Sequence, residues 1–225
     1  MKSKYAAVYA LIVLSLIVTG IFLSFMPDKV PMHYNAAGEI NRFGSKYENL
    51  IFPLATGIMG GFFLLMARYC RKKNEAGNEK VIIWSAIAVL ILFNVMFAYF
   101  LWKATAYNPG DTQTESVHGI WQISLIGLGA VFMITGNILP KARMNALVGL
   151  RTTWSMKNER VWQKSQRFAG IAFAVCGLCM IVAGFFLRGI ACAIAMITLL
   201  LAVTVLCVIA SYRIYRKDST QSSEI

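Results

Sequence analysis

Residues 168–211 read FAGIAFAVCGLCMIVAGFFLRGIACAIAMITLLLAVTVLCVIAS, and Arg188 is the only charged residue in this stretch. A helix needs about 20 consecutive apolar residues to cross the hydrocarbon core of a bilayer. The pair Arg188 and Gly189 divides the stretch into residues 168–187 and 189–211, each long enough for one crossing. A single helix over the whole stretch would be far too long for a bilayer. We therefore predict two transmembrane helices joined by a tight turn.

Four further apolar runs precede this pair, and the composition of the chain agrees with a membrane location. Hydrophobic residues make up 58% of the chain and charged residues 14%, whereas about 25% of an ordinary globular protein is charged. The four runs cover residues 5–26, 50–67, 81–102 and 120–139. The first run is longer than the apolar region of a signal peptide, which has about 7–15 residues, so we expect it to be retained. The sequence predicts an all-α, polytopic membrane protein with six transmembrane helices.

Lys and Arg are divided unequally between alternate loops. The N-terminus, the second and fourth loops and the C-terminus hold 17 of these residues, whereas the first, third and fifth loops hold 5. Loops rich in Lys and Arg remain in the cytoplasm, so we predict that both termini are cytoplasmic (N-in, C-in). Acidic residues balance the outer cations, which leaves the net charge of +12 on the inner side. This charge suits anionic lipids, and its division among loops beside the bilayer argues against direct binding of nucleic acid.

The spans and loops lack the side-chain patterns of pumps, intramembrane proteases and metal sites. Ion-coupled carriers place ionisable groups at membrane depth, and no Asp, Glu, Lys, Arg or His lies inside the six runs. The two histidines, His33 and His118, fall in outer loops without a compact ligand spacing. Cys176 and Cys179 have the spacing of a redox or zinc motif but lack a second ligand pair. We therefore expect a protein that is not an enzyme and that binds no metal or cofactor.

The first outer loop, residues 26–49, combines turn-forming residues with aromatic and polar side chains. Prolines end the preceding helix and glycines permit turns, while the other side chains suit contact with an outer partner such as a peptide. The alternative is an interfacial turn whose Tyr34, Phe43 and Tyr47 lie at headgroup level. The candidate contact residues are Asp28, Pro31, His33, Asn35, Gly38, Arg42 and Phe43.

The fourth loop is the most basic one and lies within residues 136–170, GNILPKARMNALVGLRTTWSMKNERVWQKSQRFAG. Pro140 ends the fourth span, and Ser155 is a candidate N-cap for a helix from Met156 onward. At 100° per residue, one side of that helix collects Lys157, Arg160, Lys164 and Arg167, and another collects Val161, Trp162, Phe168 and Ala169. We predict an amphipathic cytoplasmic helix between spans four and five that lies in the inner interface with Trp162 buried.

The residues before that helix have a different character. Lipid anchoring needs no Gly149, Arg151 or Thr-Thr-Trp sequence, so residues 145–154 indicate a fixed fold with hydrogen-bond partners. The candidate cytoplasmic motif comprises Asn137, Pro140, Lys141, Asn145, Gly149, Arg151, Thr152, Trp154, Asn158, Glu159, Trp162 and Arg167.

This motif resembles the signature of the SdpI family of bacterial immunity membrane proteins. The similarity includes Gly136-Asn137, Leu139-Pro140-Lys141, Asn145, Gly149-Leu150-Arg151-Thr152, Trp154, Asn158-Glu159, Val161-Trp162, Lys164, Arg167 and Gly170. The first outer loop resembles the small domain of unknown function that often precedes this signature, through Pro27-Asp28, Val30-Pro31, His33, Asn35, Gly38 and Phe43-Gly44-Ser45-Lys46. The chain departs from the family pattern at Met144, Thr153 and Gln166.

The resemblance implies a multi-pass protein of the bacterial plasma membrane that protects its cell from an extracellular antimicrobial peptide toxin. In the best-known member it also implies signalling, in which the protein holds a small DNA-binding repressor at the membrane. The outer loops would then meet the toxin, and the cytoplasmic motif would recruit the repressor. Two alternatives remain: a transporter or flippase that binds an anionic small molecule or lipid through Lys141 and Arg151, and a metal-dependent enzyme built on His33 and His118 in the loops.

The chain divides into two units on this interpretation. Residues 1–75 form an N-terminal two-helix unit with its outer loop, and residues 76–225 form a four-helix SdpI-like membrane domain. A disordered tail is expected at residues 218–225, where the sequence is rich in Ser.

Overall fold

The computed structural model describes residues 2–35, 40–73, 76–107 and 114–222 of the 225-residue chain. In this described part the long helices are α1 (Lys2–Phe25), α2 (Ile51–Lys72), α3 (Ala76–Thr105), α4 (Thr114–Ile138), α5 (Glu159–Phe186) and α6 (Ile190–Ser222). The shorter elements are the strands β1 (Lys29–Tyr34) and β2 (Ile40–Ser45) and the 3-10 helices η1 (Lys46–Leu50) and η2 (Leu139–Lys141). Six helices are long and apolar enough to cross a membrane, which confirms the predicted number of spans.

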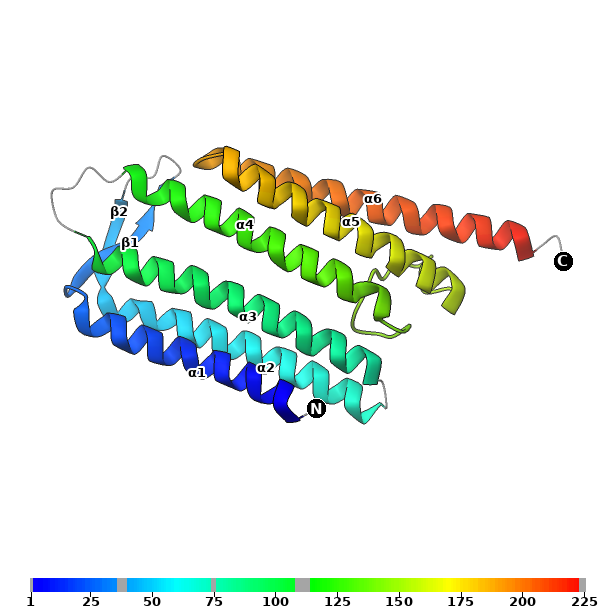
Figure 1. Ribbon diagram of the computed structural model, residues 1–225, viewed down its shortest axis with the longest axis horizontal. Helices are drawn as coiled ribbons and strands as arrows, with labels where there is room; N and C mark the ends of the chain where they lie inside the picture. Colours follow the sequence, from blue (N-terminus) through cyan, green and yellow to red (C-terminus); the bar gives the residue numbers. More distant parts are fainter. Residues whose placement is uncertain (1, 36–39, 74–75, 108–113, 223–225) are drawn as a thin grey trace.

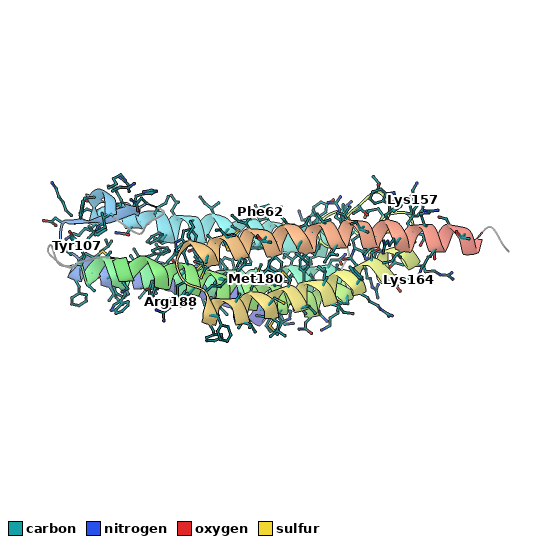
Figure 2. The ribbon with its side chains drawn as sticks, turned by 90° about the horizontal axis from the view of Figure 1, so that it is seen from above. Phe62, Tyr107, Lys157, Lys164, Met180 and Arg188 are labelled. Carbon is teal, nitrogen blue, oxygen red and sulfur yellow. The ribbon has the colours of Figure 1, made fainter. Side chains whose placement is uncertain are left out.

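The six long helices run side by side, and successive connections alternate between the two ends of the bundle (Figure 1). Both termini and the α4–α5 connection lie at one end, which we call the termini end. The hairpin of β1 and β2 and the short α5–α6 turn lie at the other end, which we call the hairpin end. Figure 2 places Lys157 and Lys164 at the termini end and Tyr107 at the hairpin end. The predicted N-in, C-in orientation corresponds to a cytoplasmic termini end.

Two hydrophobic clusters hold the bundle together. One joins α1, α2 and α3 around Ile83 and Leu90, and the other joins α4, α5 and α6 around Leu125 and Met180. Helix α6 continues to Ser222, so the tail predicted to be disordered from residue 218 is instead helical as far as that residue. The remaining large apolar side chains on the helices are mostly exposed, as expected of surfaces that face lipid.

Helices α4 and α5 approach most closely through facing glycines. A Cβ atom on Gly136 would lie 2.5 Å from the carbonyl oxygen of Gly170, and one on Gly129 would lie 2.6 Å from that of Gly177. The two glycines on each helix are seven residues apart and therefore lie on the same face. Lipid provides no hydrophobic drive for helix association, so such backbone contact is a main source of packing energy. Because glycine has no side chain, these four residues allow the backbones of α4 and α5 to pack in direct contact.

Candidate functional site

The α1–α2 loop, which was predicted to be outer, forms an antiparallel β-hairpin at the hairpin end, so the prediction of an all-α protein is wrong for this segment. The strands are short, and β1 contains Pro31. A proline has no N–H group for the strand ladder, so its presence in a sequence argues against a strand. An isolated two-stranded hairpin is marginally stable in water. Here Val30 is fully buried and packs in a cluster with Met26 of the α1–β1 turn and Leu101 of α3. This packing fixes the hairpin to the bundle.

Ion pairs and a capping box connect the hairpin to η1. Asp28 Oδ1 lies 3.1 Å from Lys46 Nζ, and Glu48 Oε2 lies 2.9 Å from Arg42 Nη1. The Ser45 N–H donates to Glu48 Oε1 at 3.0 Å in a capping box at the start of η1. Asp28 and Arg42, both predicted contact residues, therefore each form an ion pair within this loop.

The other predicted residues of this loop are divided between the surface and the interior. His33 is exposed, and its Nδ1 lies 2.6 Å from Asn41 Oδ1. The exposed ring of Phe43 lies 5.6 Å from that of Tyr107, measured between centroids. Gly38 lies outside the described residues. Among the described residues no group of three or more His, Cys, Asp or Glu side chains is placed to hold a metal ion.

A cavity of about 430 Å³ lies between the hairpin and the adjoining ends of α2, α3 and α4. Its wall includes three aromatic rings and one ammonium group, from Phe52, Phe100, Trp121 and Lys103. The remaining lining residues are Pro31, Met32, His33, Asn35, Asn49, Ala104 and Ser124. Pro31, His33 and Asn35 were predicted from the sequence, and the fold brings them to one cavity. Its volume is within the roughly 300–1,000 Å³ range of ligand pockets.

Lys103 supplies the cavity with a hydrogen-bond donor, and Trp121 contributes its ring to the wall. Trp121 Nε1 is buried and has no hydrogen-bond partner in the described part of the chain. A buried polar group without a partner costs about 1–3 kcal/mol. Lys103 Nζ lies 5.0 Å from the centre of the Trp102 ring and forms no ion pair with any described residue. The cavity can therefore hold an apolar side chain and donate hydrogen bonds to a carbonyl or carboxylate group.

Sequence reasoning did not find the aromatic and cationic half of this cavity. Phe52, Phe100, Lys103 and Trp121 come from three successive helices, and only the folded bundle brings them to one cavity. Their only signal in the sequence is an aromatic or basic residue near the outer end of an apolar run. Interfacial anchoring produces the same pattern, so the sequence alone does not distinguish the two roles.

At the termini end, residues 139–158 fold back over the bundle as a compact segment that we call the cap. Trp162 of α5 is fully buried beneath it and donates its Nε1–H to the carbonyl oxygen of Ala142 at 2.8 Å. The same cluster includes Val81 of α3 and Val148 of the cap. Residues 159–167 are the first turns of α5 rather than a separate amphipathic helix, and Trp162 is buried by protein. The burial of Trp162 was predicted, but its partner was not.

Gln166 holds the middle of the cap. Its Oε1 accepts the N–H of Leu150 at 2.9 Å, and its Nε2 donates to the carbonyl oxygen of Leu150 at 3.0 Å. The preceding Gly149 has φ of 119°, a conformation that favours glycine. A Cβ atom at this position would also lie 2.8 Å from Gln166 Oε1 and 2.9 Å from the Trp162 ring. Gly149 is thus required by both backbone conformation and space.

Short polar side chains form hydrogen bonds with the backbone N–H and C=O groups of the cap. Asn145 Oδ1 accepts the N–H groups of Leu147 and Val148, each at 2.7 Å, and its Nδ2 donates to the carbonyl oxygen of Val148 at 3.0 Å. Thr152 and Ser155 exchange side-chain and backbone hydrogen bonds at 2.9 and 3.0 Å. Since buried backbone groups need partners, these side chains allow an irregular segment to be buried.

Asn158, and not Ser155, caps α5, which corrects the predicted start of this helix. Asn158 Oδ1 accepts the N–H of Val161 at 2.8 Å, whereas the Ser155 hydroxyl is used within the cap. Asn158 Nδ2 also donates to Asp218 Oδ2 at 3.0 Å, and Lys164 Nζ lies 3.8 Å from Asp218 Oδ1. These contacts connect α6 to the start of α5.

The predicted cytoplasmic motif therefore contains two kinds of residue. Residues that build the cap or its contacts with the helices are Pro140, Asn145, Gly149, Thr152, Trp154, Asn158 and Trp162. Residues exposed at the surface are Asn137, Lys141, Arg151, Glu159 and Arg167. Of these, Arg151 extends from the folded part of the cap, and it forms no hydrogen bond or ion pair with the described residues.

Comparison with known proteins finds matches for both the N-terminal and the C-terminal parts of the chain. Residues 141–212 match the SdpI/YfhL protein family, and residues 10–57 match a domain of unknown function (DUF1648). The chain is 27% identical over 207 residues to Immunity protein SdpI of Bacillus subtilis (strain 168), an alignment that covers 92% of this chain and 93% of that protein. No solved structure matches the chain. These matches confirm the predicted resemblance and, with the six apolar helices, a multi-pass location in the bacterial membrane.

Proposed function

We propose that this chain is an immunity protein that protects its cell from an extracellular antimicrobial peptide toxin. The similarity to an immunity protein along nearly the whole chain supports this function. The division of Lys and Arg, 17 against 5, supports an orientation with the hairpin end outside and the termini end in the cytoplasm. In this orientation the cationic termini end also faces the anionic lipids of the inner leaflet.

The observation that carries the proposal is the cavity beneath the hairpin. A peptide that inserts into bilayers presents apolar side chains and a backbone with carbonyl acceptors. The rings of Phe52, Phe100 and Trp121 offer a place for such a side chain, and the Lys103 ammonium offers a donor for a carbonyl. Exposed His33 and Phe43 extend the contact surface along the hairpin. The toxin is therefore bound where it reaches the membrane.

A survival assay tests the proposed function directly. A toxin-sensitive bacterium that expresses the chain is compared with the same strain carrying an empty vector, during exposure to secreted membrane-active peptides. We expect survival to rise for the cognate peptide and to remain unchanged for detergents that lyse the membrane without a specific contact. Equal survival of the two strains across the peptides encoded near the gene would contradict the proposal.

A second role, recruitment of a small DNA-binding repressor to the membrane, is supported by Arg151. The cap holds this residue on a folded support, and its guanidinium is exposed at the termini end. Guanidinium groups recognise carboxylates in a fixed two-pronged geometry, so an acidic patch is the surface we expect on the partner. Lys141 and Arg143, also exposed, enlarge the basic surface.

Replacement of Arg151 by Ala is expected to separate the two roles. Protection from the peptide should be unchanged, because Arg151 lies at the opposite end of the bundle from the cavity. Co-sedimentation of the neighbouring repressor with membranes should fall by about tenfold, the cost of one charge-assisted hydrogen-bond pair. The matched control is Arg160→Ala, which also removes one exposed cation at the termini end, but from α5 and not from the cap. Equal loss of sedimentation for both variants would assign the effect to general charge and contradict a specific role for Arg151.

A further inference from the structure

A second hollow lies at the termini end, between α1 and α2, and it belongs neither to the cavity nor to the cap. It has a volume of about 380 Å³ and is lined by Tyr5, Ala6 and Tyr9 of α1 and by Arg68 and Arg71 of α2. The hollow thus combines two guanidinium groups with two phenols at the end of two spans. We propose that it binds the phosphate of an anionic phospholipid headgroup.

The two arginines of the hollow keep most of their hydrogen-bond donors available. Arg68 Nη2 donates to the Tyr9 hydroxyl at 2.8 Å, which orients the guanidinium and leaves its other N–H groups available. Neither Arg68 nor Arg71 forms an ion pair with a carboxylate in the part of the chain that the structure describes. Two guanidinium groups that share one hollow without an acid are a typical arrangement for a phosphate, because each can donate two parallel hydrogen bonds.

The acid that contacts the lining of the hollow, Glu79 of α3, is already engaged. Glu79 is buried, and its Oε1 accepts the Tyr5 hydroxyl at 3.0 Å. Glu79 is not among the residues that line the hollow. The Tyr9 hydroxyl accepts from Arg68, and its own proton is free to donate to a phosphate oxygen. The hollow consequently offers donors from three side chains.

The position of the hollow selects a lipid over a soluble phosphate. The spans of α1 and α2 include Tyr5, Tyr9, Arg68 and Arg71, and the residues of α1 that follow include exposed apolar side chains such as Val13. A phosphate in the hollow would therefore have its acyl chains against an apolar helix surface. Arg and Tyr near the ends of spans usually lie at headgroup depth, where lipid phosphates are concentrated.

Native mass spectrometry of the purified full-length protein in detergent provides the test, with phosphatidylglycerol as the probe. The double variant R68Q/R71Q is compared with R213Q/K217Q, which removes two exposed cations of α6 at the same end and changes the net charge equally. We expect R68Q/R71Q to bind phosphatidylglycerol about tenfold more weakly and the control to bind as the wild type does. Equal weakening of both variants, or of neither, would overturn the proposal.

A conservative variant and a soluble competitor complete the test. Tyr9→Phe keeps both charges and removes only the hydroxyl, so a smaller loss of phosphatidylglycerol affinity is expected even if R68Q/R71Q does not fold. Unchanged affinity in this variant would contradict the geometry described for Arg68. Glycerol 1-phosphate at millimolar concentration should not displace the lipid. Full displacement would identify a soluble phosphate as the ligand and overturn the assignment to a lipid.

Discussion

Replacement of Gly177 by Leu is expected to remove most of the folded protein from the membrane. A side chain at this position would collide with the backbone of Gly129, which cannot move aside as a flexible side chain can. Overpacking of a core costs typically about 1–3 kcal/mol, and contact with a helix backbone should exceed that range because α4 and α5 must separate. The measurement is the yield of monodisperse protein after detergent extraction.

Gly61→Leu is the matched control for this prediction. Gly61 lies in α2, and a Cβ atom there would meet no atom within 4 Å. We expect its yield to equal that of the wild type. Similar yields for both variants would show that contact between α4 and α5 does not determine the fold.

Trp162→Ala is expected to open the cap. Loss of a fully buried Trp costs about 3–5 kcal/mol, and the carbonyl oxygen of Ala142 also loses its donor. Trypsin should then cleave after Arg143 or Arg151, whereas the wild-type cap should resist it under the same conditions. Trp84→Ala, which removes an exposed Trp from α3, should leave this resistance unchanged. A resistant Trp162→Ala variant would contradict the central position of Trp162.

The number of spans could be predicted from the sequence because the length of an apolar run is a local property. Arg188 and Gly189 marked the α5–α6 turn correctly, and Gly189 has φ of 55° there. The packing between spans depends on pairs of distant residues, which no local pattern reveals. A Cβ atom on Gly129 would meet a partner backbone, while one on Gly61 would meet no atom within 4 Å, although both glycines lie in apolar runs.

For the cap, too, features that depend on neighbouring residues were predicted, whereas contacts between residues distant in the sequence were not. The unusual residues from Asn145 to Trp154 correctly indicated a fixed fold with hydrogen-bond partners. Helical periodicity placed Trp162 on an apolar face, but periodicity does not say whether lipid or protein covers that face. Gln166 stood out only as a departure from the family pattern, yet it supports Leu150 through two hydrogen bonds.

Survival of a toxin-sensitive strain that expresses Trp121→Ala is the decisive measurement for toxin binding in the cavity. Trp121 forms an aromatic wall of the cavity, and aromatic anchors are worth about 2 kcal/mol or more in an interface. At equal membrane level, we predict that the peptide concentration that stops growth falls by about tenfold or more relative to the wild type. Trp84→Ala, at the other end of the bundle, should protect fully. Full protection by Trp121→Ala would contradict binding of the toxin in the cavity beneath the hairpin.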